Sequence, residues 1–88
     1  MDAGQRFERV GRLIYGFHRW ASPEALRALP GDATVPAGLA ARGAGLARQY
    51  DELLAMLAAQ EGAGAQERIE ALLLEAQAFS AELASARG

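Results

Sequence analysis

The chain has 88 residues, a net charge of −2, and an apolar content of 51%. It contains no Cys, which excludes disulfides and thiolate chemistry. Its length suits one helical domain over residues 1–88, and its 21 Ala and twelve Leu favour closely packed helices over a deep ligand pocket. Nine Arg without any Lys or Asn indicate a high-GC coding sequence of bacterial or phage type.

The apolar residues give no sign of a membrane segment. No apolar run approaches the roughly 20 residues of a membrane span, and the N-terminus lacks the pattern of a signal peptide. We therefore expect a cytoplasmic protein. The charge is uneven, because residues 1–44 carry six Arg and four acids, whereas residues 45–88 carry three Arg and seven acids. This asymmetry permits head-to-tail electrostatic pairing, or an acidic partner for the first half.

A first helix is predicted from about Asp2 to Ala21, because Asp2 and Gln5 have the spacing of a capping box. On a helical wheel its apolar side chains share one arc, which we expect to face the core. The arc consists of Phe7, Val10, Leu13, Ile14, Phe17, Trp20 and Ala21. His18 falls at the edge of the arc, as a boundary residue that could bond to a neighbouring helix.

The opposite side of this first helix is polar. It holds Glu8, Arg9, Arg12, Tyr15 and Arg19. Tyr15 and Arg19 are one turn apart, so we expect the ring to support the guanidinium. Gly11 and Gly16 lie within the helix, where they either weaken it or allow another backbone to approach closely.

A short second helix is predicted next. Ser22 is a typical N-cap, Pro23 suits the first helical position, and the Pro30-Gly31 pair should end the helix after Leu29. Its two Leu, at 26 and 29, should fold onto the core. Residues 30–36 are predicted to form a loop, with Thr34 or Val35 capping the helix that follows.

Two longer helices complete the predicted fold. One begins near Pro36 and ends at the turn 62–64; its stretch 38–45 is rich in Gly and is frayed, kinked or closely packed. Its core arc holds Leu39, Leu46, Tyr50, Leu53, Leu54 and Leu57. The last helix covers about 65–86, with a coiled-coil-like seam of Ile69, Leu72, Ala76, Phe79 and Leu83, and Leu73 beside it. We predict an all-α bundle of three longer helices and one short one, the last two forming an antiparallel hairpin.

The residues that could support catalysis or metal binding are few. The chain has one His and three Ser, and Ser22 is already explained as a cap. Neither a nucleophile elbow nor a Glu-x-x-His pair is present. We therefore predict no catalytic residue, cofactor or metal ligand, and no enzymatic activity. A site built on His18 stays as an alternative.

Nucleic-acid binding is the main alternative to protein binding. Arg9, Arg12 and Arg19 form a basic stripe that could contact phosphates. The stretch "AARGAG" resembles the turn of a helix-turn-helix motif, but Asp51 stands where that motif needs an apolar residue. A nucleic-acid-binding regulator that uses the Arg stripe is therefore retained only as the alternative.

Three apolar residues fall on faces where polar residues are expected. Tyr15 lies on the polar side of the first helix, Met56 on the outer side of the third, and Leu74 opposite the seam of the last. Leu74 lies in a stripe of small residues: Ala71, Ala78, Ala81 and Ser85. Single exposed apolar residues also occur on ordinary surfaces, and that interpretation stays open.

These observations predict a non-enzymatic protein-interaction module: a small adaptor, chaperone or inhibitor that covers a partner surface, as a homodimer. Arg residues favour an acidic patch on the partner protein, and Tyr15 would anchor the contact. The predicted partner-binding residues are Arg9, Arg12, Tyr15, Arg19, Met56 and Leu74. The sequence does not identify the partner.

Overall fold

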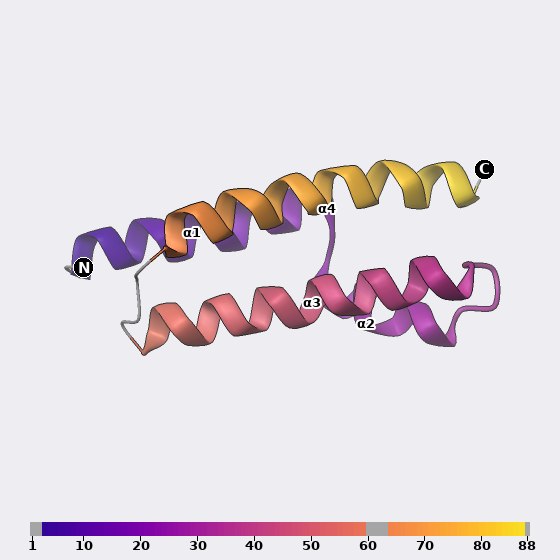
Figure 1. The fold of residues 1–88 in the computed structure, drawn as a ribbon, viewed down its shortest axis with the longest axis horizontal. Coiled ribbons are helices and arrows are strands. Elements are labelled where there is room, and N and C mark those ends of the chain that lie inside the picture. The colour runs from indigo at the N-terminus through magenta and orange to yellow at the C-terminus, as the bar shows by residue number, and fades with distance from the viewer. Residues whose placement is uncertain (1–2, 60–63, 88) are drawn as a thin grey trace.

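The computed structural model describes residues 3–59 and 64–87. Within them, its elements are α1 (Ala3–Trp20), α2 (Pro23–Ala28), the 3-10 turn η1 (Leu29–Gly31), α3 (Ala37–Ala58) and α4 (Ala65–Arg87). The predicted all-α bundle of three long helices and one short helix is confirmed. Figure 1 shows α3 and α4 packed side by side in opposite directions, as predicted for the hairpin.

The first and last helices run parallel to each other. Arg12 of α1 contacts Glu70 of α4, and one turn further along both helices the Gly16 backbone lies against the Leu73 side chain. After Trp20 the chain crosses to α3, and α2 packs along the first half of that helix (Figure 1). The result is an elongated bundle with extents of 44 × 19 × 17 Å.

One residue of the predicted α1 core arc is not in the core. Leu13 and Phe17 are fully buried, and Val10, Ile14 and Trp20 pack against the core, but Phe7 is 81% exposed. The Phe17 ring faces Tyr50 of α3 at a centroid distance of 4.7 Å. α1 and α3 are antiparallel, and Phe17 lies level with Tyr50. Phe7 is ten positions before Phe17, so it lies beyond the level of Ala58, the last residue of α3, and no turn of α3 covers it. The predicted capping residue Asp2 lies outside the described residues.

The short helix α2 begins as predicted. Ser22 is its N-cap, with its hydroxyl oxygen accepting from the amide of Ala25 at 3.5 Å, and Pro23 occupies the first turn. Leu26 and Leu29 are buried, as expected. The α-helix ends at Ala28 and tightens into η1 at the Pro-Gly pair, where a proline cannot continue the backbone ladder.

The loop before α3 differs from the prediction. Neither Thr34 nor Val35 caps the helix: the N-cap is Pro36, with no side-chain hydrogen bond. The Thr34 amide and hydroxyl instead donate to one oxygen of Asp32, at 2.9 and 2.6 Å. This turn holds the Asp32 pKa below its ordinary value, mainly through the hydroxyl. Val35 is buried instead of capping.

The Gly-rich start of α3 is helical throughout and closely packed at one point. A Cβ built on Gly43 would lie 2.6 Å from Leu29 Cδ1 and 2.9 Å from Phe79 Cζ. A hydrogen in place of a side chain therefore lets α2, η1 and α4 approach α3 here. Of the three predicted alternatives for 38–45, close packing at Gly43 is the one observed.

The turn between α3 and α4 starts earlier than expected. α3 ends at Ala58 instead of at the Gly-rich triplet 62–64, most of which lies among residues 60–63, outside the described residues. Gly64 has a φ of 73°, in the left-handed region that favours glycine, and its carbonyl accepts from the Arg68 amide at 3.1 Å.

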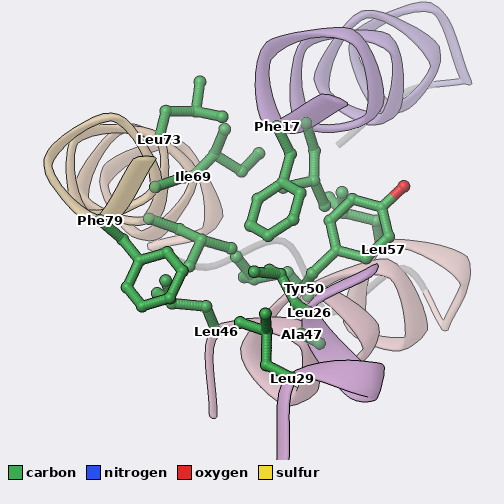
Figure 2. Packing of buried hydrophobic residues seen from close by; sticks show 14 of the residues in the cluster. Phe17, Leu26, Leu29, Leu46, Ala47, Tyr50, Leu57, Ile69, Leu73 and Phe79 are labelled. Carbon is green, nitrogen blue, oxygen red and sulfur yellow. The ribbon is translucent and has the colours of Figure 1, made fainter. Parts of the chain in front are cut away.

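The core is a single apolar layer between the helices. Phe17 and Tyr50 point toward each other across it (Figure 2), and Phe79 and Leu29 both lie close to Gly43. Its largest fully buried side chains are Leu13, Phe17, Leu57, Ile69 and Phe79. The predicted α4 seam is buried except at Leu83, which is half-buried. Each such side chain contributes about 1.5–3 kcal/mol, and no described charged residue is buried.

Candidate protein-interaction surface

A salt bridge joins α1 to α4 on the outside of the bundle. Arg12 Nε donates to Glu70 Oε1 at 2.7 Å, and Arg12 Nη2 donates to Glu70 Oε2 at 2.8 Å. These hydrogen bonds, and the positive charge, lower the pKa of Glu70. The side chains remain 56% and 41% exposed, so the pair lies at the surface and fixes the register of the two helices more than it adds to stability.

Tyr15 of α1 and Leu74 of α4 each follow this salt bridge by about one turn of their helix. Tyr15 is three positions after Arg12, and Leu74 is four positions after Glu70. Because α1 and α4 are parallel, both residues are displaced from the salt bridge in the same direction along the bundle. Tyr15 is 79% exposed and Leu74 is 67% exposed. We call this surface the α1–α4 face and define it by Arg12, Tyr15, Arg19, Glu70 and Leu74.

The other two predicted Arg residues also lie on α1, Arg19 within this face and Arg9 next to it. The Arg19 guanidinium lies 5.1 Å from the centre of the Trp20 ring, so the predicted support from Tyr15 is not observed. Indole is the stronger cation–π acceptor, and packing holds Trp20 in place. Arg9 lines a shallow groove with Arg12 and Gln66 of α4.

Met56 does not belong to the same surface. The side chain is half-buried against the core, and Arg68 Nη1 lies 3.0 Å from its sulfur. The predicted exposed position is therefore wrong, because the first turn of α4 covers this side of α3. Of the six predicted partner-binding residues, Met56 is therefore apart on α3, whereas the others lie on the neighbouring helices α1 and α4: Arg9, Arg12, Tyr15, Arg19 and Leu74.

His18 bonds within its own helix instead of to a neighbouring one. Its Nδ1 lies 2.8 Å from the Ile14 carbonyl oxygen, which only accepts, so this nitrogen carries the proton. The imidazole ring meets the Tyr50 ring edge-on at 5.7 Å, and burial raises the pKa of the Tyr50 hydroxyl. Among the described residues, no cluster of three or more His, Cys, Asp or Glu could hold a metal ion.

No family model, curated protein or solved structure matches this chain. The arguments about function therefore rest on the geometry of the described residues. None of their helices is long and apolar enough to cross a membrane.

A groove that the sequence did not predict lies between α2 and the second half of α4. It has a volume of about 330 Å³, and its apolar lining includes Trp20, Leu26, Phe79 and Leu83. Arg87 is the charged residue in its lining, and it makes a 3.5 Å contact with Asp32. The groove exists because α1 stops at Trp20 while α4 continues. The Ser-Pro helix start at 22–23 is the sequence signal that could have predicted it.

Glu70 is the member of the α1–α4 face that sequence reasoning missed. Its position away from the apolar seam indicated a solvated carboxylate, whereas it holds Arg12 from 58 positions away. No local pattern predicts a partner at that separation. Only the parallel pairing of α1 with α4, which is a tertiary feature, brings the two residues together.

Proposed function

We propose that this chain is a non-enzymatic protein-interaction module that covers the surface of a partner protein with its α1–α4 face. The observation that carries the proposal is the exposure of Tyr15 and Leu74, 79% and 67% respectively, on the neighbouring helices α1 and α4. Two large apolar side chains exposed on neighbouring helices, each one turn beyond the same salt bridge, indicate a contact surface more strongly than the same residues scattered over the molecule.

The composition of the face also supports a protein contact. Tyr and Arg are enriched at the centres of protein interfaces, where an aromatic ring gives contact area and a guanidinium gives directed hydrogen bonds. Arg12 already holds Glu70, so Arg19 is the cation on this face that would favour an acidic partner. Two parallel helices held in register by a salt bridge present these groups with little conformational freedom.

The mechanism is steric. An adaptor, a chaperone or an inhibitor of this kind needs no reacting group, because it acts by occupying the surface that another molecule would use. The alternative function, nucleic-acid binding, has less support than protein binding. Of its three-Arg stripe, Arg12 is neutralised by Glu70, which reduces an already small positive footprint.

The proposal can be tested by affinity capture with matched variants. The wild-type chain should retain a protein from a bacterial lysate that the double variant Tyr15→Ser, Leu74→Gln does not retain. With the purified partner, the double variant should bind at least about tenfold more weakly, since two contact residues are removed.

Phe7→Ser is the matched control. Phe7 is 81% exposed but lies off the α1–α4 face, so this variant loses a similar apolar side chain and should capture the same partner. A partner retained equally by all three proteins would contradict the proposal, and so would loss of binding in the Phe7 variant alone.

A further inference from the structure

We propose that the groove between α2 and the second half of α4 binds a medium-chain fatty acid. The hydrocarbon chain would lie along the apolar lining, and the carboxylate would lie on Arg87. No residue of the α1–α4 face lines this groove, so the inference goes beyond the proposed function and does not depend on it.

Most of the groove lining is hydrocarbon. Leu26, Leu29 and Phe79 are buried and form the floor, whereas Trp20 and Leu83 are half-buried and stand higher. The volume of about 330 Å³ lies at the lower end of the range for ligand sites, roughly 300–1,000 Å³. An unbranched hydrocarbon chain that enters this groove therefore leaves water and covers apolar surface that the fold leaves open.

The lining offers too few polar groups to hold an extended peptide. Such a peptide would bring backbone N–H and C=O groups into the groove, and each needs a hydrogen-bond partner once it leaves water. The polar side chains of the described lining are Ser22, Ser80 and Arg87, and the Ser22 hydroxyl already caps α2. The backbone of α2 and α4 is bonded within each helix. An acyl chain has no such groups to satisfy, so the groove suits it better.

Arg87 provides the positive charge for an anionic head group. Its guanidinium has several N–H donors in a planar fork, which matches the two oxygens of a carboxylate. The contact with Asp32 is long, at 3.5 Å, and the Arg87 side chain remains 49% exposed, so donors remain for a second carboxylate. Asp32 itself accepts two shorter hydrogen bonds from Thr34. A ligand with an apolar body and one negative end therefore complements the groove.

The positions of the two helices determine which end of the ligand lies where. α1 and α4 are parallel, and Gly16 lies against Leu73, so Trp20 lies near the level of Phe79. Arg87 follows Phe79 by eight positions, which places it roughly 12 Å further along α4. A carboxylate on Arg87 therefore directs the methyl end of the fatty acid toward Trp20. Because Trp20 is the single Trp of the chain, its fluorescence reports what enters the groove.

Titration with sodium decanoate, below the concentration at which it forms micelles, tests whether the site exists. Trp20 fluorescence and isothermal titration calorimetry should both show one saturable site per chain. Binding should tighten about two- to fourfold for each methylene added from hexanoate to decanoate, because each methylene buries further apolar surface. The Tm should rise with decanoate concentration. No saturable binding at millimolar decanoate overturns the proposal.

Two substitutions with opposite expected effects test the recognition of the carboxylate. Arg87→Gln should weaken decanoate binding about three- to fivefold and leave decanol binding unchanged, since only the acid carries a charge. Asp32→Asn should tighten decanoate binding about twofold, because Asp32 competes for the same guanidinium and repels the ligand. The Asn side chain keeps an oxygen that can accept from Thr34, so this variant retains the turn.

Arg48→Gln is the matched control for the charge change. Arg48 is exposed on α3 and does not line the groove, so this variant should bind decanoate and decanol as the wild-type chain does. Weaker decanoate binding in both the Arg87 and the Asp32 variants would mean that the salt bridge only supports the local fold, and would overturn the proposal. Equal weakening of decanoate and decanol by Arg87→Gln would overturn it as well.

Brominated fatty acids test the orientation of the ligand, since bromine quenches Trp fluorescence at close range. Decanoate brominated at its terminal carbon should quench Trp20 more strongly than decanoate brominated next to the carboxylate. The reverse order would place the carboxylate at the Trp20 end of the groove, beside Arg19, and would overturn the assignment to Arg87. Circular dichroism of each variant checks that it is folded.

The groove and the α1–α4 face can be tested separately. The double variant Tyr15→Ser, Leu74→Gln alters the face and leaves the groove lining intact, so it should bind decanoate as the wild-type chain does. Loss of decanoate binding in this variant would overturn the groove as the site. Arg87→Gln should in turn capture the same partner protein as the wild-type chain.

Discussion

At the scale of single residues, Gly43 and Gly11 show that two glycines within helices can have opposite roles. Gly43 is buried beneath Leu29 and Phe79, and a methyl group there would overlap both side chains. At Gly11 an added Cβ would meet no heavy atom within 4 Å. The first glycine is needed for packing, whereas the second only costs the helix some stability.

We therefore expect opposite results from the same substitution at the two glycines. Gly43→Ala should lower the free energy of unfolding by about 1–2 kcal/mol, because overpacking outweighs the gain in helix propensity. Gly11→Ala should raise it by about 0.5–1 kcal/mol. Urea denaturation of both variants, at a concentration where the chain is monomeric, measures the two changes. A stabilised Gly43 variant would show that the core is looser than the described packing.

At the scale of the helices, three of the helix–helix interfaces carry an exposed salt bridge each. Arg12–Glu70 joins α1 to α4, Arg27–Asp51 joins α2 to α3, and Arg42–Glu82 joins α3 to α4. Exposed pairs of this kind contribute little to stability individually. Their value lies in register: opposite charges meet only when the helices are aligned along their axes.

These salt bridges predict a loss of stability in acid. Hydrogen bonds from Arg12 and Arg42 lower the pKa values of Glu70 and Glu82 in the folded chain. Because the pKa of each carboxyl group is lower in the folded chain than its unfolded value of 4.5, its ionisation stabilises the folded chain above pH 4.5. This stabilisation is lost as the pH falls through the folded-state pKa. The urea midpoint should therefore decrease between about pH 5 and pH 3.

The double variant Glu70→Gln, Glu82→Gln is the comparison for this acid effect. The variant cannot gain a proton at either position, so its midpoint should fall less steeply over the same range. Identical slopes for the variant and the wild-type chain would show that other carboxylates, such as Asp32, cause the acid sensitivity.

The helices themselves could be predicted because their signals are local. Ser22 and Pro23 mark the start of α2, and the spacing of the α4 seam marks its buried side. The predictions were wrong where the burial of a residue depends on a neighbouring helix, which a helical wheel does not describe. Phe7 has the wheel position of a core residue but extends past the end of α3, whereas Met56 has an outer position but lies beside Arg68 of α4.

At the scale of the whole molecule, one continuous core joins two different three-helix arrangements. One end is built from α1, α3 and α4 and contains Phe17, and the other is built from α2, η1, α3 and α4 and contains Phe79; Figure 1 shows α1 and α2 at these opposite ends. The two ends share α3 and α4, each of which runs through both. The chain exposes 5407 Å², against about 5,000 Å² expected for a compact monomer of its mass.

Shared helices predict cooperative unfolding of the two ends. Phe17→Leu and Phe79→Leu should each lower the free energy of unfolding by about 1–2 kcal/mol in a single transition. Trp20, the one Trp of the chain, reports fluorescence, and circular dichroism reports total helix. The two signals should change at the same urea concentration in both variants. An earlier fluorescence change in the Phe79 variant would mean that the α2 end opens by itself.

The candidate surface was predictable only in part. Tyr15 and Leu74 were identified because each departs from the polarity of its own helix, and both are exposed as predicted. Their positions relative to each other, and the salt bridge between Arg12 and Glu70, depend on α1 running parallel to α4. No periodicity within either helix carries that information, since it arises from how the connecting segments return the chain.

The parallel arrangement of α1 and α4 also determines where the chain can be joined to another. Ala3 and Arg87 lie at opposite ends of the 44 Å bundle (Figure 1), so a circular version of one chain would need a linker as long as the molecule.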